Sequence, residues 1–135
     1  MTDLNYAELE ALNSEFGALG QPVAVLAFPC DQFHQEPGTD ADVAAFARAK
    51  GATFPLFSKT NVNGPSQHAV YKELKAALSG HAGHGDIEWN FVKFLVGKDG
   101  VAVRRYGKNV SPAQIKPDIE ALLAGKLRSG DRGVP

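Results

Sequence analysis

Apolar side chains near the start of the chain recur three and four residues apart, which is the spacing of one face of an α-helix. We predict a helix over residues 3–19, with Thr2 or Asp3 as its cap and Gly20 with Pro22 ending it. The apolar stripe of this helix consists of Leu9, Leu12, Phe16 and Leu19. The first predicted element is therefore an amphipathic helix that packs against a core.

Three more segments have the pattern of amphipathic helices, over about residues 39–50, 65–78 and 111–123. Their inward-facing residues are predicted to be Val43, Phe46 and Ala47 in the first segment, and Val70, Leu74 and Leu78 in the second. Pro117 is awkward inside the last helix. We expect a first turn over 111–116 and a main body that starts at Pro117, because proline suits the first helical position.

The apolar run VAVLAF, residues 23–28, contains no polar residue. Such a run is typical of a strand covered on both faces, as in a parallel sheet. FPLF at 54–57 predicts a short extended segment, and residues 90–106 predict a β-hairpin around a Lys-Asp-Gly turn. This order of elements resembles a thioredoxin-like fold of the α/β class that lacks the strand before the first helix.

Length and composition narrow the class of protein. A chain of 135 residues fits one domain, predicted over 1–126, with a loose tail over 127–135. Lys and Arg number 14 against 15 Asp and Glu, so no strong field favours nucleic acid or an anionic membrane. No signal peptide and no apolar run of roughly 20 residues is present, so we expect a cytoplasmic protein.

Five longer stretches point to one family: TDLNYAELEAL, LAFPCDQF, QEPG, FPLFSKTNVNG and EWNFVKFLVGKDGVAVRRYG. They occur in the order and approximate spacing of the glutathione peroxidases, which the chain resembles over nearly its whole length. The resemblance implies thiol-dependent reduction of hydrogen peroxide and organic hydroperoxides in the oxidative stress response. Glutathione or another thiol is the implied reductant, and no metal or bound cofactor is implied.

Cys30 is the only cysteine, and it follows the predicted buried strand. A thiol in apolar surroundings forms little thiolate, and free cysteine commonly packs as a small core residue. The resemblance agrees, because it puts the peroxidatic selenocysteine or cysteine two positions before Met1. We therefore expect Cys30 to be structural, and the chain as written to lack the peroxidatic residue and to be inactive.

Two interpretations of this expectation stay open. In the first, the true product starts upstream with a selenocysteine whose codon is read as a stop. Thioredoxin-dependent members of the family carry a resolving cysteine after a phenylalanine of the second helix, whereas Phe46 is followed by Ala47. A selenocysteine, glutathione-reduced type therefore fits better. In the second, the chain is a catalytically inactive thioredoxin-like binding module.

The remaining site residues are implied by the resemblance. Gln35, Trp89 and Asn90 match the glutamine, tryptophan and asparagine that surround the peroxidatic atom in the family. Amide and indole N–H groups donate hydrogen bonds without a charge of their own, which suits stabilisation of a chalcogen anion. The loop before Gln35 is shorter than usual, because His34 stands alone between Phe33 and the glutamine, so Gln32 is the alternative amide.

Other polar residues leave alternatives open. His81 and His84 suggest a metal, but no carboxylate or cysteine cluster accompanies them, which favours a solvated loop. Arg104, Arg105 and Lys108 either attract a glutathione carboxylate or an acidic reductase, or form an exposed strand end. The short segment before Trp-Asn-Phe resembles that of monomeric members of the family, so we expect a monomer.

Overall fold

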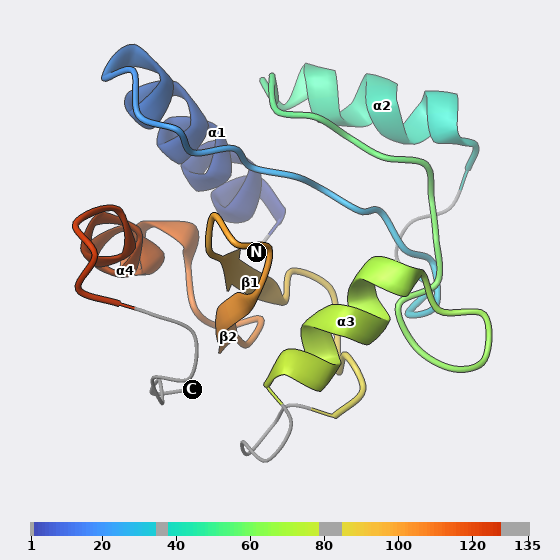
Figure 1. The fold of residues 1–135 in the computed structure, drawn as a ribbon. Coiled ribbons are helices and arrows are strands. Elements are labelled where there is room, and N and C mark those ends of the chain that lie inside the picture. Colours follow the sequence, from blue (N-terminus) through green and yellow to red (C-terminus); the bar gives the residue numbers. More distant parts are fainter. Residues whose placement is uncertain (1, 35–37, 79–84, 128–135) are drawn as a thin grey trace. The chain divides into compact units, whose positions relative to one another are not determined.

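The computed structural model describes residues 2–34, 38–78 and 85–127 (Figure 1). The chain separates into two compact units. The first comprises Met1–Thr60 with Ser111–Gln114, and the second comprises Asn61–Val110 with Ile115–Pro135. The predicted domain over 1–126 stays a prediction. Of the predicted tail, Leu127 is buried and 128–135 lie outside the described residues.

The first unit begins with α1, Thr2–Ala18, which confirms the first predicted helix. Its buried residues are Asn5, Tyr6, Leu12 and Phe16. Leu19 lies beyond the helix and is 65% exposed, so its place on the apolar stripe was wrong. The helix ends one residue earlier than predicted, and Gly20 has a φ of +68°, which suits glycine at a helix terminus.

The second helix, α2, spans Asp40–Ala49 and confirms the prediction for 39–50. Thr39 and Asp42 form a capping box at its start. Phe46 is 44% exposed, so the prediction that it faces inward was wrong. Its ring lies at the border of the apolar face, because one edge contacts the Tyr6 ring at 5.9 Å while Lys50 Nζ lies 5.4 Å from its centre.

A carboxylate joins α1 to the segment after α2. The backbone N–H of Thr53 donates to Glu10 Oε1 at 2.7 Å, and Thr53 Oγ1 donates to Glu10 Oε2 at 2.6 Å. Burial by itself raises the pKa of Glu10, but the hydrogen bonds from Thr53 and Ser14 outweigh it and hold the pKa below its usual value. The ionised carboxylate therefore stabilises this unit.

The run 23–28 is extended but is not covered on both faces, so that part of the prediction was wrong. Burial alternates along the run, and Leu26 is 54% exposed. Among the described residues its ladder contact is a parallel bridge between Ala27 and Leu56, with Phe57 N donating to Ala27 O at 2.9 Å. A single bridge leaves most of the run outside a regular sheet, although the parallel direction agrees with the prediction.

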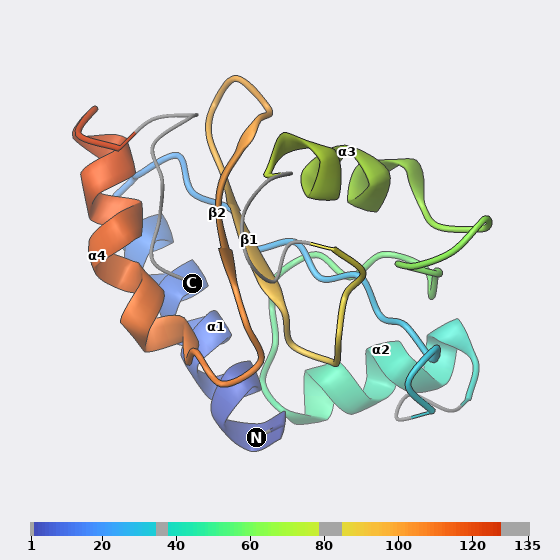
Figure 2. The same cartoon turned by 90° about the horizontal axis from the view of Figure 1, so that it is seen from below.

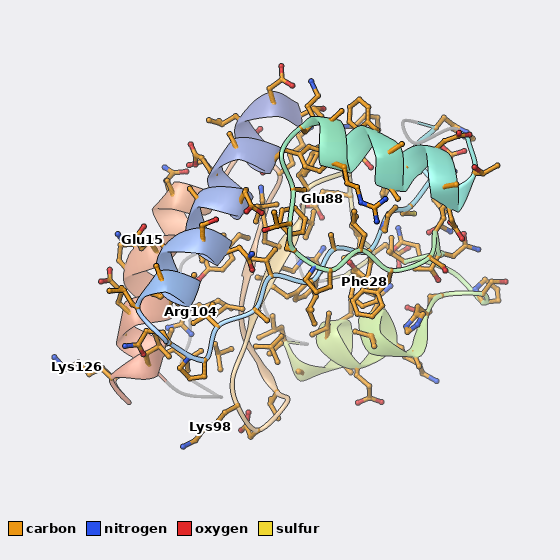
Figure 3. All side chains as sticks on the ribbon, turned by 90° about the horizontal axis from the view of Figure 1, so that it is seen from above. Glu15, Phe28, Glu88, Lys98, Arg104 and Lys126 are labelled. Atoms are coloured by element: carbon orange, nitrogen blue, oxygen red, sulfur yellow. The ribbon has the colours of Figure 1, made fainter. Side chains whose placement is uncertain are left out.

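The second unit is built on the predicted hairpin. Strands β1, Lys93–Val96, and β2, Ala102–Tyr106, pair antiparallel with an irregularity between Leu95 and Val96. The connecting turn includes Gly100 at a φ of +83°, and Lys98 points away from its tip (Figure 3). The regular sheet in the described part of the chain is this two-stranded one.

Helices α3, Ala69–Ala77, and α4, Pro112–Leu123, lie on opposite sides of the hairpin (Figure 2). The start predicted at 65 was wrong, because the His68 side chain caps α3 by accepting from Val70 N. Val70 is 40% exposed, against the prediction, and Tyr71 instead packs edge-on against Phe94 at 6.2 Å. Leu78, beyond the helix, is buried as predicted.

Helix α4 continues through Pro117, so the predicted break before this proline was wrong. A proline here removes one backbone donor near the helix start, and the apolar face compensates because Ile115 and Ile119 are both buried. The Tyr106 hydroxyl donates to Asp118 Oδ2 at 2.6 Å. Burial, and then this contact with the Asp118 carboxylate, raise the pKa of Tyr106, so the hydroxyl remains a donor that joins β2 to α4.

Candidate active site

Cys30 is buried at the end of the extended run, 7% exposed, as the sequence predicts. Its sulfur contacts its own loop. The backbone N–H of Gln32 donates to Cys30 Sγ at 3.3 Å, and the thiol donates to Gln32 Oε1 at 3.6 Å. Thr60 N donates to the carbonyl of Pro29 at 2.9 Å and fixes the residue before it. These contacts suit a packed thiol better than an exposed nucleophile.

The loop after Cys30 turns sharply. His34 N donates to the carbonyl of Asp31 at 3.0 Å, and His34 has a φ of +59°. Gln35, the predicted site amide, lies outside the described residues, so its role stays a prediction. Gln32, the alternative amide, is described, and its side-chain oxygen faces the Cys30 thiol.

Trp89 and Asn90 are consecutive residues on a bend and turn in the second unit, so the hairpin start predicted at residue 90 was wrong. Strand β1 begins only at Lys93, and Phe91 has a φ of +62°. A left-handed backbone at a non-glycine residue is incompatible with the extended conformation, which explains the later start of the strand. The turn leaves Trp89 37% exposed, and it places two uncharged donor side chains on consecutive residues.

Lysines flank the aromatic rings of this turn. Lys108 Nζ lies 5.6 Å from the centre of the Trp89 ring, and Lys93 Nζ lies 6.0 Å from that of Phe91. Lys93 also donates to the carbonyl of Val110 at 2.8 Å. Because β1 and β2 are antiparallel, the segment before β1 and the segment after β2 meet at one end of the hairpin. The Trp89 ring is therefore held beside a cation.

Arg105 supports the segment that leads into Trp89. Its guanidinium donates to the carbonyls of Gly85 at 2.8 Å and Asp86 at 3.0 Å, and pairs with Glu88 Oε2 at 2.8 Å. The side chain is only 7% exposed, and its guanidinium carbon lies 5.5 Å from the centre of the Phe94 ring. Of the two alternatives left open for Arg105, the exposed strand end is therefore wrong, because the side chain is buried and organises residues 85–88.

A second support comes from Asn63. Its Nδ2 donates to the carbonyl of Ile87 at 2.7 Å, and its Oδ1 accepts from Ile87 N at 2.7 Å. Lys75 Nζ donates to Asn63 Oδ1 at 3.2 Å and lies 3.7 Å from Asp86 Oδ1. These contacts were missed from the sequence, where Asn63 reads as a turn residue before Gly64 and Lys75 as a solvated helix position.

Metal and membrane chemistry receive no support from the described residues. Within 2–34, 38–78 and 85–127, no group of three His, Cys, Asp or Glu side chains is arranged to hold a metal ion. His81 and His84 lie outside these ranges. In the same part of the chain, no helix is both long and apolar enough to cross a membrane.

Comparisons with known proteins agree with the motifs. The family model described as "Glutathione peroxidase" matches residues 1–75. "Hydroperoxy fatty acid reductase gpx1" of Synechocystis sp. is 47% identical over 125 residues, covering 87% of this chain and 73% of that protein. "Phospholipid hydroperoxide glutathione peroxidase 1, chloroplastic" of Arabidopsis thaliana is 45% identical over 126 residues, covering 92% and 52% respectively. The chain thus spans about half the length of this chloroplastic relative.

Solved structures give the same result for the fold. "Crystal structure of Trgpx in apo form" matches with a TM-score of 0.71 at 31% identity, covering 89% of this chain and 71% of that one. "Crystal structure of T. cruzi GPX1" matches with a TM-score of 0.67, also at 31% identity and with the same coverage. This likeness confirms the predicted α/β, thioredoxin-like class. The chain belongs to the glutathione peroxidase family, oxidoreductases that act on peroxides.

Proposed function

We propose that this protein reduces hydrogen peroxide and organic hydroperoxides with a thiol reductant, glutathione or another thiol, in the oxidative stress response. The observation that carries the proposal is the Trp89–Asn90 turn, which places a partly exposed indole and an amide on consecutive residues, after a segment that Asn63 and Arg105 hold in place. Family membership supports the same reaction. The relative from Synechocystis is named a hydroperoxy fatty acid reductase, which favours an organic hydroperoxide as substrate.

The chemistry explains why such donors are useful. One hydroperoxide and two thiols give an alcohol, one water and a disulfide, so the O–O bond breaks while the thiols are oxidised. A chalcogen anion attacks one oxygen, and the departing oxygen gains negative charge until it is protonated. The Trp89 indole N–H and the Asn90 amide can donate to these anions without adding a competing charge. Gln35 is proposed as a third donor on the family pattern.

The attacking chalcogen is proposed to be a selenocysteine or cysteine carried two positions before Met1, and Cys30 is proposed to be structural. The buried, loop-bonded sulfur of Cys30 supports its exclusion. The sequence of the DNA upstream of the Met1 codon tests the first part. An in-frame TGA or cysteine codon at that position is expected, and a conventional stop or unrelated sequence would contradict it.

The reaction is tested with the protein that includes this upstream position. Peroxide-dependent thiol oxidation is measured for the wild type, for a variant with serine at the upstream position, and for Cys30→Ser. We expect the upstream serine variant to lose turnover and Cys30→Ser to retain at least half of it. Loss of turnover in Cys30→Ser, with a normal melting temperature, would assign the chemistry to Cys30 instead. Absence of turnover in the wild type with every hydroperoxide and thiol tried would favour a binding module.

We also propose a subcellular location and an oligomeric state. We keep the sequence-based prediction of a cytoplasmic monomer, although several relatives are named as chloroplastic or mitochondrial. Fractionation of cells that express the tagged protein, followed by light scattering of the purified protein, tests both parts. Recovery in an organelle fraction, or a mass of more than one chain, would contradict them.

A further inference from the structure

Burial of the Trp89 ring is not enough to fix the position of the segment that carries it. Trp89 is 37% exposed and lies on a bend, and a turn at Asn90 and Phe91 separates it from the start of β1. Ile87, two residues earlier, is only 5% exposed. The position of the indole therefore depends on how the backbone at Ile87 is held.

Asn63 holds that backbone from both sides of one residue. Its carboxamide donates to the Ile87 carbonyl and accepts from the Ile87 N–H, each at 2.7 Å, so both peptide groups that flank Ile87 are oriented by one planar side chain. Both contacts are partly buried, where an unmade hydrogen bond is costly. Asn63 is 24 residues from Ile87 in the chain, so this is a tertiary constraint.

Lys75 helps to orient the carboxamide, in the same direction as the Ile87 backbone itself. Its ammonium donates to Asn63 Oδ1 at 3.2 Å and to the carbonyl of Val62 at 2.8 Å. An ammonium has only donors, so the oxygen of the amide must face it, and Nδ2 is then directed at the Ile87 carbonyl. The Lys75 side chain is 12% exposed and lies 3.7 Å from Asp86, which adds a contact one residue before Ile87.

We propose that Asn63 is a positioning residue for peroxide reduction: oriented by Lys75, it fixes the backbone at Ile87 and thereby places Trp89 and Asn90. This inference rests on the proposed function only where the test measures kcat and KM. The constraint on Trp89 itself is measurable without turnover, because Trp89 is the only tryptophan of the 135 residues and its fluorescence reports on this turn.

The test compares Asn63→Ala and Asn63→Asp with the matched control Asn61→Ala in the protein used for the activity assay. Asn61 belongs to the same Asn-Val-Asn stretch, its side chain is exposed, and its described hydrogen bonds are made by its backbone. Aspartate keeps the size and the Oδ1 acceptor but places a second oxygen against the Ile87 carbonyl. Lys75→Met is a milder variant, which removes the ammonium that orients the amide.

Both Asn63 variants are expected to shift the Trp89 emission to longer wavelength and to raise its acrylamide quenching constant about twofold. We expect kcat to fall about tenfold to a hundredfold, as for misplacement of a reacting group by about 1 Å, with KM for the hydroperoxide changed less than twofold. Lys75→Met is expected to change the same quantities in the same direction but less. Asn61→Ala is expected to match the wild type in each.

Wild-type fluorescence in Asn63→Asp and Lys75→Met would overturn the inference, whatever the activity. If Asn63→Ala fails to fold, Asn63→Asp and Lys75→Met decide between the outcomes. A loss of kcat that accompanies a lower melting temperature, with unchanged fluorescence, would give Asn63 a merely structural role. That result would also overturn the inference. Absence of turnover in the wild type would contradict the proposed function, while a shifted emission would still establish the constraint on Trp89.

Discussion

The loop after Cys30 and the turn at Trp89 are supported in different ways. The Cys30 sulfur contacts Gln32, two residues away, and His34 closes a turn on Asp31. The segment before Trp89 is held by side chains distant in the chain, 24 residues for Asn63 and 17–20 for Arg105. A local turn follows from neighbouring residues, whereas the Trp89 turn needs its tertiary partners in place. Substituting residues that are distant in the chain should therefore affect Trp89 far more than it affects the loop after Cys30.

The largest expected effect is on the indole itself. Trp89→Phe keeps an aromatic ring but removes the N–H donor, so turnover should fall about a hundredfold if the donor stabilises charge in the reaction. Because the ring is partly exposed, the melting temperature should change little. Steady-state peroxide assays and thermal melts measure the two quantities. Tyr71→Phe, which removes an aromatic hydroxyl elsewhere in the unit, is the control, and equal losses in both variants would contradict a specific role.

Arg105→Lys is expected to have the next largest effect. Lysine keeps the charge but cannot reproduce the fork that reaches two carbonyls and Glu88. The free energy of unfolding should fall by about 2 kcal/mol, with the Glu88 pair contributing little of it because that carboxylate is half-exposed. Denaturant unfolding measures this value. Arg104→Lys is the control, and an unchanged midpoint for Arg105→Lys would remove its role in supporting residues 85–88.

Unfolding at low pH tests the contact between Glu10 and Thr53 in the first unit, which also joins residues that are distant in the chain. The pKa of Glu10 in the folded protein is below its usual value of 4.5, so its contribution to stability is present above that value and is lost as pH falls through the folded pKa. As pH is lowered from 6, the free energy of unfolding of Glu10→Gln should therefore fall less than that of the wild type. Denaturant unfolding at each pH measures both values. Asp3 and Asp42, whose pKa values are also lowered, keep part of the slope in the variant. A wild-type slope would assign Glu10 no role.

The smallest effect is expected from Lys108→Ala. The cation beside the exposed Trp89 ring is worth about 0.5 kcal/mol or less, so stability should stay nearly unchanged. The Trp89 emission intensity should nevertheless change, because the ammonium is removed from beside the ring. Lys98→Ala is the matched control, since Lys98 points away from the hairpin tip (Figure 3). Identical emission in both variants would show that Lys108 does not sit over the indole in solution.

Much of the fold could be predicted from local patterns. Helical spacing and capping residues located α1 and α2 to within two residues, and the Asp-Gly turn located the hairpin. Predictions failed where the environment of a residue depends on the rest of the chain. Leu26 is exposed within an apolar run, Phe46 is exposed at the border of an apolar face, and α4 passes through Pro117. An apolar side chain favours burial, but it is buried only where another part of the folded chain packs against it.

The sequence by itself determined the family, the hairpin, the buried state of Cys30 and the adjacency of Trp89 and Asn90. Each follows from residues close together in the chain, or from motifs that can be read in order. Only the tertiary structure decided that Trp89 lies on a turn before β1, and that Asn63 and Arg105 hold residues 85–88. An asparagine or arginine can bond many backbone groups, and the partner it meets depends on how strands and helices separated by about 20 residues come together.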